Sequence, residues 1–202
     1  MSSIGHAPTP HLKRIMIFID GGYFRNILPK YSNIDPQNDP KQIAKFIEAI
    51  PYRIENFLRF QHSRLETIRI YYYDGIVLPS DQNYNKNEQF FKDIKSNCTP
   101  KIPFELKYGR LIDGGKGKYR QKGVDVLLSI DLVVKAFQDH FDLAMLVAGD
   151  DDFVDAVKIV KDFTGKRIIG LYKPEETSSR LIDSLDYKLP LLPEPFFKDI
   201  SV

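Results

Sequence analysis

This sequence is poor in the residues that small proteins use as covalent or metal cross-links. It has one cysteine, Cys98, among 202 residues, and no tryptophan. A single cysteine excludes both a disulfide framework and a zinc site built from cysteines, and it suits a reducing compartment. A chain of this length hides roughly 70% of its unfolded surface on folding, so one hydrophobic core is sufficient for stability.

Long apolar runs and a charge excess of one sign are also missing. No run approaches the roughly 18 residues of a membrane span, and the N-terminal residues lack the apolar core of a secretory signal. The 29 basic and 27 acidic residues give a net charge of +2. No overall basic field therefore attracts nucleic acid, and a polyanion would have to bind through local patches. We expect a cytoplasmic protein without membrane association.

The length predicts one domain, because about 150 residues per domain is usual. We expect a disordered tail over residues 1–12, the domain over 13–190 and a second tail over 191–202. Strands are expected at 15–19, 67–73, 104–112, 143–148 and 167–172, several as continuous apolar runs. Helices are expected at 23–28, 41–50, 51–65, 81–96, 124–137, 153–165 and 179–185. This alternation predicts a three-layer α/β sandwich with a mainly parallel, Rossmann-like central sheet.

Acidic residues follow three of the predicted strands. Asp20, Asp74 and Asp150 should lie at one edge of the sheet, where ligands of parallel sheets bind. Helix capping explains any one of them about equally well. It does not explain Asp150-Asp151-Asp152, whose adjacent like charges repel. A divalent cation held by Asp150 and Asp152, with Asp151 facing away, would relieve this repulsion.

Two more acids, Asp125 and Asp131, belong to the apolar helix predicted at 124–137. They lie about 240° apart around the helix axis, so they cannot face the same small site. Asp125 is the better site candidate because helix starts face the same edge as strand ends, although capping explains it as well. Asp131 is expected to form a buried hydrogen bond or ion pair, for example with Lys135.

Three segments resemble the motifs of NYN domains, the PIN-like domains of the LabA/DUF88 group. They are Ile-Phe-Ile-Asp20-Gly-Gly-Tyr-Phe, Lys122-Gly-Val-Asp125-Val-Leu-Leu and Leu-Val-Ala-Gly-Asp150-Asp-Asp152-Phe. The resemblance implies a PIN-like metal-dependent ribonuclease in which Asp20, Asp125, Asp150 and Asp152 bind Mg²⁺ or Mn²⁺. This chain departs from the pattern at Tyr23, where many relatives carry asparagine, and Asn26 is the nearest substitute.

Such a site predicts hydrolysis of RNA by a metal-activated water that leaves a 5′-phosphate. None of the four histidines follows a predicted strand, so a histidine mechanism is not expected. A basic segment, 107–122, leads directly into Asp125. We predict that Lys116, Lys118, Arg120 and Lys122 bind phosphates there, and that Tyr23 and Tyr119 stack on bases. A solvated hairpin tip is the alternative interpretation of this segment.

Two other functions remain open. A phosphohydrolase with an aspartyl nucleophile needs a second acid two residues later, and Gly22 occupies that position. A non-catalytic RNA-binding or protein-interaction module on the same fold is the stronger alternative, because a fold does not fix a function. The expected partner is single-stranded RNA, and the sequence leaves open whether two copies form a homodimer.

Overall fold

The computed structural model describes residues 12–28, 38–58, 64–98, 103–113 and 119–191. Its strands are β1 (Leu12–Asp20), β2 (Arg64–Val77), β3 (Phe104–Asp113), β4 (Tyr119–Lys122), β5 (Leu143–Val147), β6 (Arg167–Tyr172) and β7 (Tyr187–Pro190). Its helices are α1 (Gly21–Ile27), α2 (Pro40–Phe57), α3 (Tyr84–Asn97), α4 (Val124–Phe137), α5 (Val154–Thr164) and α6 (Ser179–Ser184), with short 3-10 helices at Asp151–Phe153 and Pro174–Glu176. The expected tails fall almost entirely outside these residues. No helix in the described ranges is long and apolar enough to cross a bilayer.

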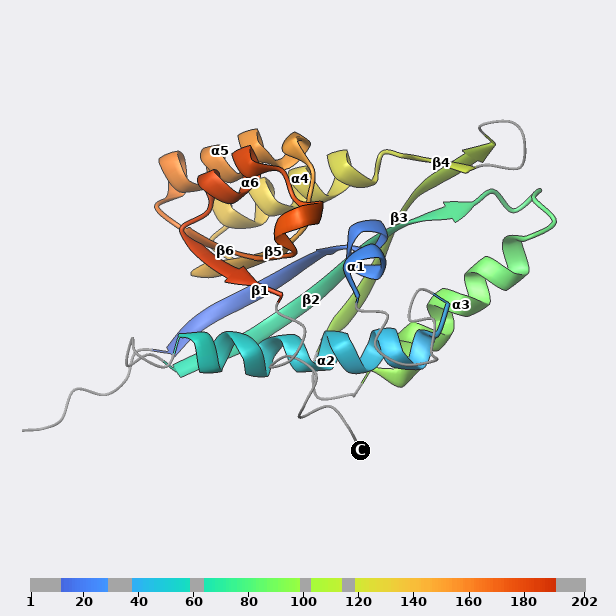
Figure 1. Cartoon of the computed structure of the whole chain (residues 1–202), viewed down its shortest axis with the longest axis horizontal. Coiled ribbons are helices and arrows are strands. Elements are labelled where there is room, and N and C mark those ends of the chain that lie inside the picture. Colours follow the sequence, from blue (N-terminus) through green and yellow to red (C-terminus); the bar gives the residue numbers. More distant parts are fainter. Residues whose placement is uncertain (1–11, 29–37, 59–63, 99–102, 114–118, 192–202) are drawn as a thin grey trace, which may run out of the picture.

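The described strands form one sheet in the order β4-β3-β2-β1-β5-β6-β7 (Figure 1). Every neighbouring pair is parallel except β3 and β4, which are antiparallel. The chain builds outward from β1 through β2 and β3, and later adds β5, β6 and β7 on the other side of β1. The strand order therefore reverses at the β1–β5 pair, which is where ligands bind in open α/β sheets.

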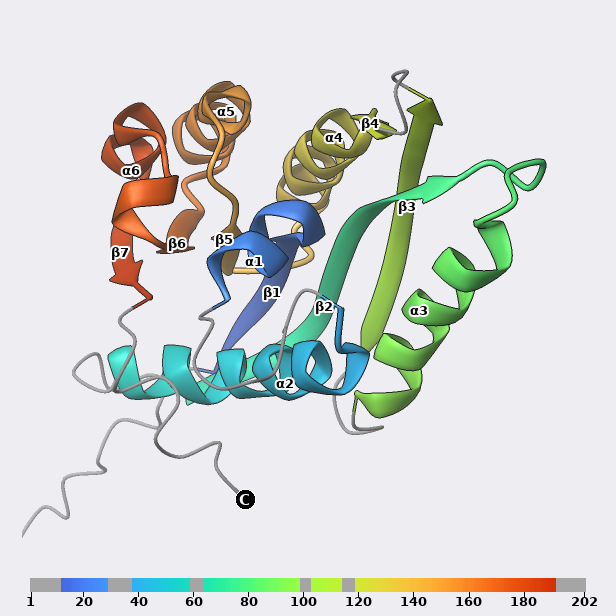
Figure 2. The ribbon, with the colours of Figure 1, turned by 45° about the vertical axis from the view of Figure 1, so that its right-hand side comes forward.

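Helices cover both faces of the sheet, as Figure 2 shows. Ile15, Ile17 and Ile19 of β1 belong to the core cluster that includes α1, α2 and α3 side chains. Met16 and Phe18 belong to the cluster formed with α4, α5 and α6. Because successive side chains of a strand point to opposite faces, a strand covered on both faces needs an apolar residue at every position. The predicted three-layer sandwich is confirmed.

Some boundaries differ from the prediction. The helices expected at 41–50 and 51–65 are one helix, α2, with Pro51 inside it. Its buried side chains lie on both sides of the proline, with Ile47 and Ile50 before it and Ile54 after it, so packing against the sheet offsets the roughly 3 kcal/mol that an interior proline costs. Strand β2 runs on to Val77, which places Asp74 within the strand rather than at its end.

Strands β4 and β7 were not expected from the sequence. All four residues of β4 are exposed, and none of them is aliphatic. It is a strand because residues 119–122 pair with Asp113 to Arg110 of β3. Sequence patterns detect strands by the alternation of apolar and polar residues, and four exposed residues have no such alternation. The pairing with β3 therefore could not be predicted from the sequence.

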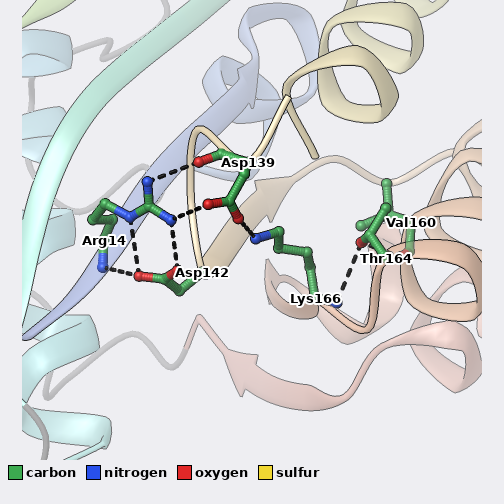
Figure 3. A network of polar contacts seen from close by, with 6 residues as sticks. All are labelled: Arg14, Asp139, Asp142, Val160, Thr164 and Lys166. Atoms are coloured by element: carbon green, nitrogen blue, oxygen red, sulfur yellow. Dashed lines mark hydrogen bonds and ion pairs between the residues drawn. The ribbon is translucent and has the colours of Figure 1, made fainter. Parts of the chain in front are cut away.

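Arg14, near the start of β1, joins several segments of the chain through the contacts that Figure 3 shows. Its guanidinium donates to both carboxylate oxygens of Asp142, with N–O distances of 2.8 and 3.2 Å, and to the carbonyl oxygen of Asp139 at 2.7 Å. Lys166 pairs with the Asp139 carboxylate. Together these contacts join β1 to the connections before β5 and before β6. The Arg14 hydrogen bond also lowers the pKa of Asp142.

Replacing Arg14 with methionine should lower the free energy of unfolding at pH 7, because it unpairs Asp142. The unfolded chain binds the Asp142 proton more tightly than the folded chain does. The Arg14 contribution is therefore complete above the unfolded pKa of about 4 and is lost as the pH falls below it. Urea unfolding at pH 7 and pH 3 measures the effect. The matched control is Arg69→Met, whose pairing with Glu105 is exposed and is expected to contribute less.

Candidate active site

Asp20 and the residues that follow β5 lie side by side, because β1 and β5 are paired as far as Ile19 and Val147. Asp20 is the N-cap of α1, and its Oδ1 atom accepts a hydrogen bond from the Tyr23 N–H at 3.1 Å. The capping and functional interpretations of this residue are therefore compatible. Asp20 is the last residue of a central strand, β1.

The triplet after β5 separates as predicted. Asp150 is the N-cap of a 3-10 helix, and its Oδ1 accepts from the Asp152 N–H at 3.3 Å. Asp151 turns away and accepts hydrogen bonds from Ser178 and from Arg180, the latter at 3.0 Å. Asp150 and Asp152 are exposed at the end of the sheet. Of three consecutive acids, Asp151 therefore makes structural contacts, whereas Asp150 and Asp152 are exposed.

Asp125 lies in the first turn of α4, which has the predicted bounds, 124–137. The N-cap of this helix is Gly123, whose φ of 81° lies in the left-handed region that favours glycine. The pKa of Asp125 is raised first by burial and then by the charges of Asp150 and Asp152. Asp125 is therefore close enough to both exposed carboxylates for their repulsion to be felt.

Asp20 belongs to the same group of charges. Its pKa is raised to about 6, chiefly by burial and also by the charge of Asp125, although the Tyr23 N–H hydrogen bond acts in the opposite direction. Asp125 thus couples Asp20 on one side with Asp150 and Asp152 on the other. We call these four residues the carboxylate cluster. No lysine or arginine of the described chain forms an ion pair with any of them.

The other acids near this edge are each paired with a cation. Asp74, which is 3% exposed, forms an ion pair with Arg25 of α1. Asp131 forms ion pairs with Lys107 at 3.2 Å and Lys135 at 3.6 Å, as predicted for a buried acid. It also accepts a hydrogen bond from the Tyr73 hydroxyl at 2.8 Å. Neither acid is available to a ligand in the way that the carboxylate cluster is.

The chemistry of the carboxylate cluster fits a hard divalent cation. Mg²⁺ and Mn²⁺ prefer oxygen ligands, and Mg²⁺ is usually held by one or two carboxylates with water in the remaining positions. Within the described ranges, no three Asp, Glu, His or Cys side chains are grouped closely enough to hold one ion. A cation here would accordingly be held by a pair of these carboxylates, and it would relieve the repulsion that raises the pKa of Asp125.

The predicted RNA-binding residues are only partly described. Lys116 and Lys118 lie outside the described residues. Arg120 and Lys122 are exposed on β4, where they alternate with Tyr119 and Gln121. Lys122 is two residues before α4 begins and three before Asp125. Asn83 donates a hydrogen bond to the Tyr119 hydroxyl, which donates to Asp81. The binding role of these residues stays a prediction.

Tyr23 is held in a structural contact. Its ring lies against Gly149, where a Cβ atom would collide with it, so only glycine allows this approach. Its hydroxyl accepts from the Lys173 N–H at 3.0 Å and bonds the Thr177 hydroxyl at 2.5 Å. Tyr23 therefore joins α1 to the segment after β6. Asn26, the suggested substitute, is exposed on α1.

Two variants separate the structural role of Tyr23 from the predicted stacking on bases. Tyr23→Phe should cost about 1–2 kcal/mol of unfolding free energy, because the Lys173 N–H loses its acceptor. It should leave RNA affinity within about twofold, because the ring remains. If the ring stacks on a base, Tyr23→Ala should weaken RNA binding by roughly 5- to 100-fold. Equal affinities for all three proteins would contradict stacking by Tyr23.

The sequence did not reveal two residues beside the carboxylate cluster. Arg25 lies on α1 and neutralises Asp74, which is 49 positions away in the chain. Gln121 of β4 reaches α1: a Cβ added to Gly22 would lie 3.2 Å from its Oε1 atom. Arg25 could have been suspected, because it lies five positions after Asp20 on the helix that Asp20 caps. Gln121 could not, because no pattern in the sequence predicted β4.

Comparisons with known proteins agree with this description. The family model for the NYN domain matches residues 14–192. The fold is similar to the crystal structure of a protein of unknown function from Vibrio parahaemolyticus, with a TM-score of 0.58 and 21% sequence identity over 92% of this chain and 97% of that chain. No curated protein matches the sequence significantly. Since the model match extends over most of the sequence, the chain belongs to the NYN domain family, which has the fold of the PIN-like nucleases.

Proposed function

We propose that this protein is a metal-dependent endoribonuclease that hydrolyses phosphodiester bonds of single-stranded RNA. The observation that carries the proposal is the carboxylate cluster. Four acids from three separate parts of the chain are electrostatically coupled at the edge where the strand order reverses. Acids without cationic partners are unfavourable for stability, and they are typical of sites that bind a cation.

A pair of carboxylates drawn from Asp20, Asp125, Asp150 and Asp152 would hold Mg²⁺ or Mn²⁺. When bound, such an ion supplies charge neutralisation at the phosphate and activation of water. The role of the carboxylates is to fix where the ion is bound, and so where the phosphate is attacked. They lie at the starts of three helices: Asp20 caps α1, Asp125 is in the first turn of α4, and Asp150 caps the 3-10 helix that contains Asp152.

Arg120 and Lys122 would bind the RNA backbone next to this site. Their side chains are exposed along β4, and the chain passes directly from β4 into the helix that carries Asp125. Contacts with phosphates position a nucleic acid without reading its sequence. Because β4 is exposed along its length, RNA bound there can extend past the carboxylate cluster on both sides. This arrangement favours cleavage inside the RNA rather than at its ends.

A non-catalytic RNA-binding module is the second candidate. Two observations favour it: Tyr23 is used for a structural contact where many relatives carry asparagine, and no three metal-binding side chains of the described residues form one group. Such a protein would bind RNA through β4 and leave it intact.

Incubation of labelled single-stranded RNA with Mg²⁺, Mn²⁺ or EDTA separates the two candidates. We expect the wild-type protein to cleave with either metal and not with EDTA. Asp150→Asn should slow cleavage by at least about 100-fold, because it removes one charge from the cluster. Asp155→Asn, an exposed acid of α5, is the matched control and should cleave normally. Equal cleavage by wild type and Asp150→Asn would exclude this site, whereas RNA binding without cleavage would support the module.

A further inference from the structure

A cavity of about 380 Å³ is lined in part by Arg25 and Gln121, two residues that lie close to Asp20 or to the helix that it caps. Its walls come from α1, β2, α3, β3 and β4, whose arrangement Figure 2 shows. The lining side chains that matter here are Arg25, Asp74, Lys86, Asn87, Phe90 and Gln121. We infer that this cavity is a subsite for one nucleobase of the RNA, next to the phosphate at the carboxylate cluster. The inference rests on the proposed function, because it places the base beside the cleaved bond.

Gly22 is close both to Gln121, which lines the cavity, and to Asp20 of the carboxylate cluster. A Cβ atom built on this residue would lie 3.2 Å from Oε1 of Gln121 and 3.4 Å from Oδ1 of Asp20. The Gln121 amide and the Asp20 carboxylate are therefore both close to Gly22. Arg25 provides a second link, because its charge acts to lower the pKa of Asp20. A nucleotide whose phosphate lies at Asp20 can thus reach the cavity with its base.

One wall of the cavity suits a flat ring. The Arg25 guanidinium lies over the Phe90 ring, 5.9 Å from its centre. The same guanidinium is fixed by the Asp74 ion pair and by a hydrogen bond of 3.1 Å to the Tyr72 hydroxyl. Proteins that bind single-stranded RNA stack its bases on aromatic rings and on guanidinium planes. The Arg25 guanidinium and the Phe90 ring together form one stacked surface, and the Asp74 ion pair fixes the guanidinium without a ligand.

The polar groups of the cavity suit the edge of a base. The Oδ1 atom of Asn87 accepts from the Val77 N–H at 3.1 Å, which leaves its NH₂ group as a donor. Gln121 adds a second amide. The charges of Arg25 and Asp74 compensate each other, so Lys86 remains as the positive group that can bind a flanking phosphate. An uncharged planar ligand with amide-like edges matches this lining.

The first test measures binding without cleavage. Fluorescence anisotropy in EDTA compares the affinities of labelled oligo(A), oligo(C) and oligo(U) of equal length. We expect wild type to prefer one base by at least about fivefold. Gln121→Ala should bring the three affinities within about twofold of one another. Gln138→Ala, at the C-terminal end of α4 and far from this edge, is the matched control and should keep the preference.

The second test follows the side-chain amides directly. In NMR spectra, titration with the nucleoside 5′-monophosphate of the preferred base should shift the NH₂ signals of Asn87 and Gln121 and leave that of Gln138 in place. Unshifted signals, together with a preference that survives Gln121→Ala, would overturn the subsite.

Cleavage is scored separately, so the two proposals can fail independently. A protein that cleaves RNA in Mn²⁺ but treats all homopolymers alike would contradict the subsite and leave the nuclease intact. A protein that prefers one base through Gln121 but cleaves nothing would contradict the nuclease and leave the subsite. Failure of wild type to bind any of the oligonucleotides in EDTA would contradict the subsite, and the cleavage assay with Mn²⁺ would then decide the nuclease by itself.

Discussion

Asp20→Asn and Asp125→Asn are each expected to slow RNA cleavage by at least about 100-fold, and the double variant should be little slower than the slower single variant. The two carboxylates are coupled electrostatically and would hold the same ion, so removing either disables the same unit. Asparagine is a good N-cap, so the start of α1 should survive the replacement of Asp20. Single-turnover rates with Mn²⁺ and excess protein measure this effect without a contribution from product release.

The double variant is the informative member of this set. If Asp20 and Asp125 served separate steps, their effects would multiply, and the double variant would be slowed by roughly 10,000-fold. Asp155→Asn again provides the control for removal of one negative charge from the surface. A normal rate for Asp20→Asn would show that the member of the carboxylate cluster at the end of β1 takes no part in the reaction.

The second expected result is a gain in stability. In the absence of metal at pH 8, Asp20→Asn should raise the free energy of unfolding by up to about 3 kcal/mol. Burial and the charge of Asp125 raise the pKa of Asp20 to about 6, so its ionised form is less favourable in the folded chain than in the unfolded chain. Asparagine has the same shape and no charge. Urea unfolding in EDTA measures the difference.

Added Mn²⁺ should reverse this order. It should stabilise wild type, because it binds the folded chain, and it should stabilise Asp20→Asn much less. The matched control is Asp142→Asn, because Arg14 lowers the pKa of Asp142 and its charge is favourable. That variant should be destabilised, with or without metal. A loss of stability for Asp20→Asn in EDTA would mean that the Asp20 charge is compensated and would remove the physical basis of the metal site.

Local sequence patterns predicted the elements that are buried on both faces. The runs in β1 and β5 have apolar residues at every position, and α4 has the bounds that its apolar pattern predicted. Such patterns are reliable because burial acts on each side chain separately, whatever the partner segment is. The placement of Asp20 and Asp150 at one edge followed from the direction that parallel strands share.

The partners of the charged residues could not be predicted in this way. Asp74 and Asp20 had equivalent sequence signals, yet Asp74 is neutralised by Arg25 and Asp20 is left to the carboxylate cluster. Gln121 reaches the site only because β4 folds back on β3. The sequence by itself determined the class of fold, the buried segments and the edge where acids gather, since these depend on local hydrophobic periodicity. Only the tertiary structure decided which acids keep an uncompensated charge, because an ion pair depends on which strands become neighbours in the sheet.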